Sequence, residues 1–324
     1  MPRRQSFVVE PKQKGVTPYR LLCRALGVPS GFVKRLVVEG HVTVDGSSDA
    51  LNLPLKSGAV LEVVWPEELH RQATTKTPRQ AVKILYEDAH RLVVDKPAGV
   101  PVVPERRRWK KTVLDLLEAT AGDYSHLKVV HRLDKHTSGA LLLARDRGTK
   151  RELCQAFLER RIGKEYLALV RGRFPEDEGE IDAPISKDRR HALRMVIEEG
   201  RGKPSVTQFR VEERLDGYTW LRLFPLTGRT HQIRVHLAHR GFPILGDSLY
   251  GARAQLLLSD LKRGYRPKRG QEERPILDRV ALHSCALEFD AVEGGEERLR
   301  VESPLARDLD VVRRQLARWR APRT

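Results

Sequence analysis

The sequence predicts a protein of mixed α and β structure, class α+β, built in two parts. Its 324 residues suit two domains or one large one. From residue 80 onward, segments with the apolar period of a strand alternate with segments that have the period of a helix. Residues 66–79 are polar and without period, which predicts a linker between this long region and a smaller unit.

The smaller unit is predicted to be an α/β domain over residues 16–65, preceded by a flexible tail over residues 1–15. Apolar residues on one face predict a first helix, 17–27, and a second short helix, 30–40, ends at a glycine. HVTVDG and AVLEVVWP then read as strands, with a turn at Asp45 and Gly46.

The region 80–324 opens with two strands in KILYEDAHRLVVDKPAG. Thr112 is a candidate cap for the helix VLDLLEAT, and strands are predicted at LKVV and GALLLAR. Thr149 and Glu152 form a capping-box pattern at the start of TKRELCQAFLERRIG. KEYLALVRG and YTWLRLFPL read as later strands, Thr230 is a candidate cap for HQIRVHLAHRG, and ARDLDVVRRQLARWRA reads as a terminal helix.

The charge points to a polyanionic partner. Sixty Lys and Arg against 43 Asp and Glu leave a net charge of +17. Such a field attracts nucleic acid and, less strongly, an anionic membrane surface, although a merely soluble basic protein has the same composition. The three cysteines form no CxxC pair, and no apolar run has membrane-spanning length or the form of a secretory signal. These features favour the cytoplasm.

One acid stands among cations. In HRLDKHTSGALLLARD, Asp134 follows a predicted strand and lies between Arg132 and Lys135, which favour its ionised form. Such a carboxylate can be a nucleophile, a base or a metal ligand, or simply a salt-bridge partner. For an isolated H-R-L-D the salt bridge is the more common role.

Two further segments favour a functional role for this acid. TGRTHQIRVH places Arg229 just before a predicted helix, where its planar fork suits a carboxylate or a phosphate. KEYLALV places Tyr166 on a strand, as either a core residue or a site residue. ERRRWKK, residues 105–111, suits base stacking beside phosphate contacts, or is a solvated loop, and the charged residues 262–275 read as an exposed loop.

These motifs resemble the RluA-type pseudouridine synthases. HRLDKHTSGALLLARD, KEYLALV, PLTGRTHQIRVHLAHRGFPILGDSLYG and ILYEDAHRLVVDKPAGV occur in that family's order, and LHSCALEF is similar to its closing strand. The resemblance covers about residues 82–305. The unit before it is similar to the alpha-L RNA-binding module that often precedes this catalytic domain. A central, largely antiparallel sheet with flanking helices is therefore expected.

The resemblance implies isomerisation of uridine to pseudouridine in structured RNA, without a cofactor or metal. Asp134 matches the family's catalytic Asp, acting on the ribose as nucleophile or base. Arg229 matches the arginine that pairs with this Asp, and Tyr166 the ring that stacks on uracil and helps to remove its C5 proton. His131 is expected to be a structural hydrogen-bonding residue, and the spacing of His231, His236 and His239 does not favour zinc.

The target uridine must be flipped out of a stem or lie in a loop. Arg132 is expected to fill the vacated stack or to hold the displaced strand. The residues expected to bind RNA are Lys96, Arg132, Lys135, Thr137, His231, Gln232 and Arg234. Large-subunit rRNA is the favoured substrate and tRNA the second, with a monomer and no obligatory protein partner. The alternatives are a non-catalytic RNA-binding protein that kept the fold, and a metal-dependent nuclease, which would require clustered acids.

Overall fold

Two compact units make up the computed structural model, one of residues 1–81 and 103–125 and the other of 82–102 and 126–324. The described residues are 3–13, 15–26, 33, 36–37, 39–48, 54–65, 82–104, 111–118, 124, 126–251, 254–266, 272–291, 295 and 297–320. The predicted linker 66–79, most of the second predicted helix and residues 105–110 lie outside them. The expected catalytic domain, 80–324, includes residues 103–125, which belong here to the first unit.

The first unit contains a three-stranded antiparallel sheet in the order β1-β3-β2. Its elements are β1 (Arg3–Val8), the 3-10 helix η1 (Pro11–Gln13), α1 (Pro18–Leu26), β2 (Val42–Val44), β3 (Val60–Trp65) and α4 (Val113–Glu118). Leu22 of α1, Leu36 and Leu61 are fully buried in its core. As predicted, the chain turns at Asp45 and Gly46, which both have positive φ.

The prediction of a flexible tail over residues 1–15 is wrong. Residues 3–8 form β1 and pair with β3 from Arg3 opposite Trp65 to Val8 opposite Val60. The following Val9 is 1% exposed. A strand whose partner lies more than 50 residues away along the chain has little local signal, which is why a basic N-terminal segment resembled a tail.

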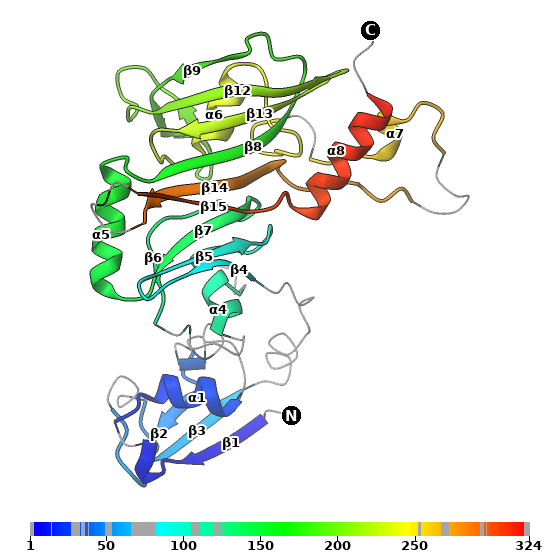
Figure 1. The fold of residues 1–324 in the computed structure, drawn as a ribbon. Coiled ribbons are helices and arrows are strands. Elements are labelled where there is room, and N and C mark those ends of the chain that lie inside the picture. Colours follow the sequence, from blue (N-terminus) through cyan, green and yellow to red (C-terminus); the bar gives the residue numbers. More distant parts are fainter. Residues whose placement is uncertain are drawn as a thin grey trace. The chain divides into compact units, whose positions relative to one another are not determined.

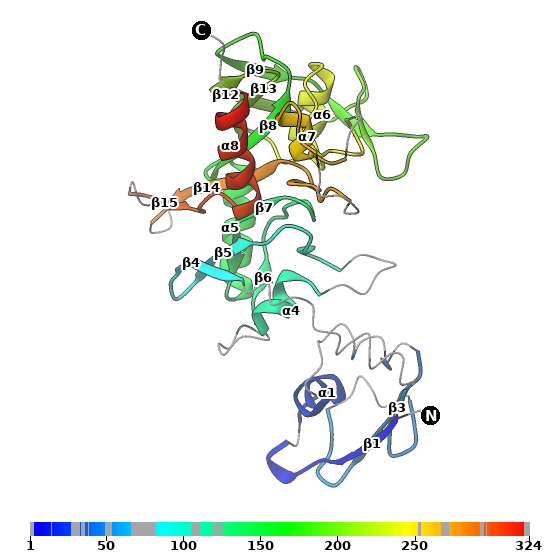
Figure 2. The same cartoon turned by 90° about the vertical axis from the view of Figure 1, so that its right-hand side faces the viewer.

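The second unit is built on one large sheet. Its main order is β4-β5-β7-β14-β8-β13-β12-β9, with β6 paired to β7 and β15 to β14 (Figures 1 and 2). The strands are β4 (Lys83–Glu87), β5 (Arg91–Lys96), β6 (Lys128–Val129), β7 (Ser138–Ala144), β8 (Gly163–Arg171), β9 (Glu178–Asp182), β12 (Val206–Leu215), β13 (Tyr218–Pro225), β14 (Leu282–Asp290) and β15 (Arg298–Glu302). β7 and β14 are parallel, and the other pairs in this sheet are antiparallel, so the expected largely antiparallel sheet is confirmed.

β14 lies between β7 and β8, although it comes last of the three in the sequence. Its contact with β7 is close, because Ser284 pairs with Gly139. A Cβ added at Gly139, which has a φ of +112°, would lie 2.1 Å from the Ser284 carbonyl oxygen. Only glycine is compatible with this close pairing of the two strands.

The helices of the second unit are α5 (Arg147–Leu158), α6 (Gln232–His239), α7 (Leu258–Leu261) and α8 (Arg307–Trp319), and β10 (Ile185–Lys187) with β11 (Met195–Ile197) forms a separate hairpin. α5 packs against β6 and β7, and α6 against β11, β12 and β13. Asp146, not Thr149, is the N-cap of α5: its carboxylate accepts from the Thr149 backbone N–H at 3.0 Å. Across the described residues, no helix is both long and apolar enough to cross a membrane.

Candidate active site

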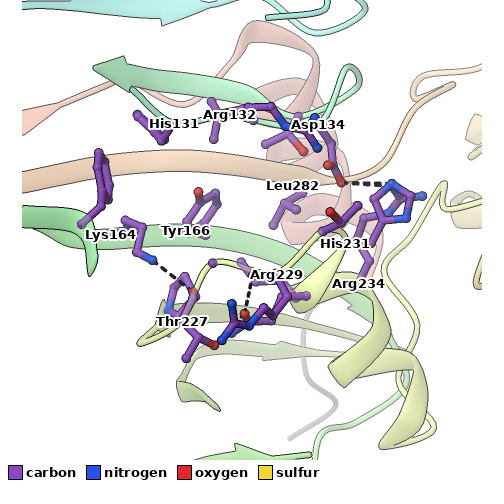
Figure 3. A pocket seen from close by; sticks show the side chains of 18 of the residues that line it. His131, Arg132, Asp134, Lys164, Tyr166, Thr227, Arg229, His231, Arg234 and Leu282 are labelled. Carbon is purple, nitrogen blue, oxygen red and sulfur yellow. Dashed lines mark hydrogen bonds and ion pairs between the residues drawn. The ribbon is translucent and has the colours of Figure 1, made fainter. Parts of the chain in front are cut away.

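A cavity of about 530 Å³ in the second unit brings the three predicted motifs together. Its walls come from the loop that joins β6 to β7, from the start of β8, and from the segment between β13 and α6. Figure 3 shows Asp134 on the first wall, Lys164 and Tyr166 on the second, and Thr227, Arg229 and His231 on the third. A cavity of this size suits a small organic group such as a nucleoside.

Asp134 sits in the loop before β7 with 27% of its side chain exposed. Its backbone carbonyl accepts from the Thr137 N–H at 3.0 Å, which closes the loop into a turn. One carboxylate oxygen, Oδ2, accepts from Nη1 of Arg234 at 3.0 Å. His231 Nε2 lies 3.8 Å from the same oxygen. The acid is therefore anchored through its backbone and aimed by a guanidinium.

Arg234 is held by a second, fully buried acid. Its Nε and Nη2 donate to the two carboxylate oxygens of Asp247 at 2.7 and 2.9 Å. Asp247 also accepts from the backbone N–H groups of Leu249 and Tyr250. Burial opposes the charge of Arg234, but the hydrogen bonds and charge of Asp247, aided by Asp134, outweigh it and raise the pKa of Arg234. The fork is fixed on Asp247, and its remaining nitrogen is directed at Asp134.

The predicted pairing of Arg229 with Asp134 is wrong. Arg229 is exposed, and its Nε donates to the carbonyl oxygen of Pro204 at 3.3 Å. The reason lies in the start of α6, which begins at Gln232. Arg229 therefore belongs to the connection before the helix, whereas Arg234, in the first turn, faces the acid. Sequence spacing alone did not distinguish these two arginines.

The cap predicted at Thr230 is also absent. His231 is the N-cap residue, has the left-handed φ of 57°, and makes no side-chain cap hydrogen bond. Its Nδ1 shares a hydrogen bond of 3.0 Å with the hydroxyl of Tyr250. Burial lowers the pKa of His231, although the charge of Asp134 opposes this change. A non-glycine residue in this conformation is retained here by its contacts with the site.

Gln232 and Lys96, both expected to bind RNA, are buried in internal roles. Gln232 Oε1 accepts from the Arg229 N–H at 2.9 Å, and its Nε2 donates to the Val206 carbonyl at 2.9 Å, so this side chain holds the start of α6. Lys96 is fully buried and donates to the carbonyl oxygens of Pro97, Val100 and Lys135. Burial, followed by the charge of Arg279, lowers its pKa to about 7. Lys96 ties the KPAG turn to the loop that carries Asp134.

The other residues expected to bind RNA differ in exposure. Arg132 is exposed and lines the cavity, and Lys135 is half-buried. Thr137 is 2% exposed and Arg234 9%, so both face the inside of the site. Of the cations on these motifs, Arg132 and Arg229 are the ones placed at the surface beside the cavity.

Tyr166 lies on β8, opposite Ser284 of β14 and Leu223 of β13, and is 8% exposed. Burial raises its pKa, and the charge of Asp134 adds to this effect. The phenol therefore stays protonated in the free protein. A protonated phenol in this position offers a flat surface for a base.

Lys164 lies two residues before Tyr166 on the same face of β8. It is a site residue that the sequence motifs did not single out. Its Nζ donates to the Thr227 carbonyl oxygen at 3.1 Å (Figure 3). Burial, followed by the charge of Arg160, lowers the pKa of Lys164 to about 8. The signal that was available is the period of two along a strand, which places Lys164 and Tyr166 side by side.

His131 has the structural role predicted for it. Its Nε2 accepts from the Leu142 backbone N–H at 3.0 Å, and its ring contacts that of Phe157. Burial, with a contribution from the charge of Lys164, lowers the pKa of His131 to about 3. In the part of the chain that the structure describes, no group of three or more metal-ligating side chains is present.

Asp134 is aimed into a cavity whose edge carries exposed arginines, an arrangement that suits an enzyme acting on an anionic substrate. The comparisons with known proteins give this class a family. The family model described as RNA pseudouridylate synthase matches residues 90–239. The chain is 36% identical to "Ribosomal large subunit pseudouridine synthase C" of Yersinia pestis over 296 residues, which cover 89% of this chain and 88% of that one.

The Escherichia coli (strain K12) protein of the same name is 35% identical and covers 86% of each chain. The solved structure of "Human RNA Pseudouridylate Synthase Domain Containing 1" is 29% identical, with a TM-score of 0.53, and covers 76% of this chain and 99% of that one. The chain belongs to the RluA-type RNA pseudouridine synthase family, as its motifs indicated. It is thus an enzyme that isomerises uridine in RNA.

Proposed function

We propose that the substrate is large-subunit rRNA and that Asp134 is the catalytic carboxylate. The curated relatives carry large-subunit rRNA in their names, and they match nearly the full length of this chain. The observation that carries the assignment of Asp134 is the chain of contacts from Asp247 through Arg234 to its Oδ2 atom. A group held in this way is ready to react without rearrangement.

In this proposal the target uridine enters the cavity with its base on Tyr166 and its ribose toward Asp134. Asp134 attacks the anomeric carbon, or takes a proton from the neighbouring ribose carbon, and the N-glycosidic bond breaks. Uracil rotates and its C5 bonds to the ribose C1′, while the Asp134 carboxylate leaves C1′ or returns the proton to the neighbouring carbon. C5 then loses its proton and N1 gains one. Arg132 and Arg229, exposed at the edge of the cavity, bind the flanking phosphates.

The remaining parts of the proposal concern the rest of the protein. The domain 16–65 is proposed to bind RNA as an alpha-L-type module; its support is its similarity to that module and the net charge of +17 on the whole chain. A cytoplasmic monomer without an obligatory protein partner is proposed as well. Sedimentation of the full chain at several concentrations tests the monomer.

The experiment for the substrate maps pseudouridines in total RNA from a strain without this gene, its parent, and strains that carry either the native gene or Asp134→Asn. The expected result is loss of one or more pseudouridines from large-subunit rRNA, restored by the native gene alone. Because the amide has no ionised oxygen, Asp134→Asn should lose at least about 10⁴-fold in rate while it still binds RNA. Loss confined to tRNA would move the substrate to the second class, and restoration by Asp134→Asn would contradict the assignment of the acid.

A further inference from the structure

Among the described side chains that line the cavity, Lys164 is the one half-buried cation without a carboxylate partner. Arg234 shares its charge with two acids, whereas the hydrogen-bond acceptor of Lys164 among the described residues is the Thr227 carbonyl at 3.1 Å. An ammonium group has three N–H donors, so two remain for a molecule in the cavity. The mechanism above uses neither of them.

The surroundings of Lys164 make its positive charge costly in free energy. The cavity lining includes the uncharged side chains of Val130, Cys154 and Phe157, and His131, which is close enough to Lys164 to feel its charge and whose low pKa keeps it neutral. Half-buried among such groups, an ammonium loses hydration that a neutral carbonyl only partly replaces. A ligand that brings negative charge next to Lys164 would compensate for this lost hydration.

The reaction produces such a charge. When the bond from ribose C1′ to uracil N1 breaks, both of its electrons stay on the base, and the anion is spread over N1 and the two carbonyl oxygens. This holds whether Asp134 attacks the sugar or removes its proton. Lys164 is two residues from Tyr166 on one face of β8, a separation of about 7 Å, which is comparable to the width of a stacked base.

We propose that Lys164 is a catalytic residue that donates a hydrogen bond to a carbonyl oxygen of uracil and stabilises the uracil anion after glycosidic cleavage. It keeps its proton throughout, so the isomerisation remains balanced. The inference rests on the proposed role of Asp134 at the ribose. The exposed Arg132 and Arg229 are better placed for phosphates, which leaves the half-buried Lys164 for the base.

The first test measures single-turnover rates and RNA affinity for Lys164→Met, Lys164→Gln and Lys164→Arg on large-subunit rRNA transcripts. Lys164→Gln keeps an N–H donor for Thr227 but has no charge. Both uncharged variants should lose about 10²-fold in rate with RNA affinity within about threefold of the parent, and Lys164→Arg should lose less. Lys83→Met, which removes the same charge from exposed β4, should react at the parental rate.

The second test uses transcripts that contain 5-fluorouridine, whose base is the more stable anion. Its C5 carries no proton to remove, so consumption of the nucleoside reports the cleavage step. The loss in Lys164→Gln should be smaller for 5-fluorouridine than for uridine. An equal loss for both bases, or a loss in RNA affinity alone, would indicate a phosphate contact and overturn the proposal.

Folding and substrate failures are distinguished by the controls. Circular dichroism checks each variant, and Lys164→Gln, the smaller change, decides the result if Lys164→Met does not fold. If the parent does not convert the rRNA transcript, it is the proposed substrate that fails. If the parent is active and Lys164→Gln matches its rate, the role of Lys164 alone is refuted.

Discussion

The two ends of the cavity hold their charges in opposite ways. At one end, Asp134, Arg234 and Asp247 form a continuous chain of ion pairs in which every guanidinium nitrogen has an acceptor. At the other end, Lys164 has one backbone carbonyl and mostly apolar neighbours. The first end is organised before substrate arrives, and the second is completed by the substrate. An enzyme that must bind a neutral base and later stabilise its anion benefits from this division.

The strongest test of the organised end is Arg234→Lys. A lysine keeps the charge but lacks the planar fork, so it cannot contact both Asp247 and Asp134 with fixed geometry. We expect kcat to fall by about 10²-fold, with a smaller change in KM. Steady-state kinetics on the rRNA transcript measure both values.

Arg229→Lys is the matched control for Arg234→Lys, because Arg229 lies five residues away and is exposed. We expect a change mainly in KM, since its guanidinium faces the solvent side of the cavity. An equal fall in kcat for the two variants would show that Arg229 acts on Asp134 as much as Arg234 does. The description of the Asp134 end as organised by Arg234 would then be wrong.

A smaller effect is expected from Asp247→Asn. The amide can accept one hydrogen bond from Arg234 but brings its own N–H groups toward the guanidinium, so the fork loses its fixed orientation. Because the pair is buried, the free energy of unfolding should fall by about 3 kcal/mol. The rate should fall by about tenfold, less than in Arg234→Lys. Urea denaturation and single-turnover kinetics check the two parts, and parental values in both would contradict the role of Asp247.

The smallest effect concerns acid stability at the Lys164 end. The pKa of His131 in the folded protein is about 3, below its ordinary value of 6.5. Between these values the unfolded chain binds more protons, so stability rises with pH across this window and is lost as the pH falls. The urea midpoint of the parent should therefore drop more between about pH 7 and about pH 4.5 than that of His131→Gln, whose neutral amide oxygen can accept from Leu142. Equal drops in the urea midpoint of the two proteins would contradict the lowered pKa of His131.

Much of this arrangement was predictable from local sequence. Period and turn residues located most strands and helices, the turn at Asp45 and Gly46 followed from residue type, and Asp134 stood out as an acid among cations. The cap of α4 followed as well: Thr112 Oγ1 accepts from the Asp115 N–H at 3.2 Å, and the Asp115 carboxylate accepts from the Thr112 N–H at 2.8 Å.

The rest depends on contacts between distant residues. The choice of Arg234 over Arg229 requires the left-handed His231 and the buried Asp247, and neither has a local signature. β1 is stabilised by pairing with β3, and the internal role of Lys96 requires the Lys135 carbonyl. Lys164 could have been predicted locally, because the alternation along the strand that pointed to Tyr166 places Lys164 on the same face.

The position of β14 has a consequence for the synthesis of this protein. Asp134 precedes β7, Lys164 and Tyr166 lie on β8, and these strands are joined in the sheet only through β14, which begins at Leu282. A ribosome that has translated as far as Asp247 has made Asp134, Lys164 and Tyr166. The nascent chain still lacks β14, which joins the two walls and carries Leu282 of the cavity lining. We therefore expect activity toward RNA only after β14 has been synthesised.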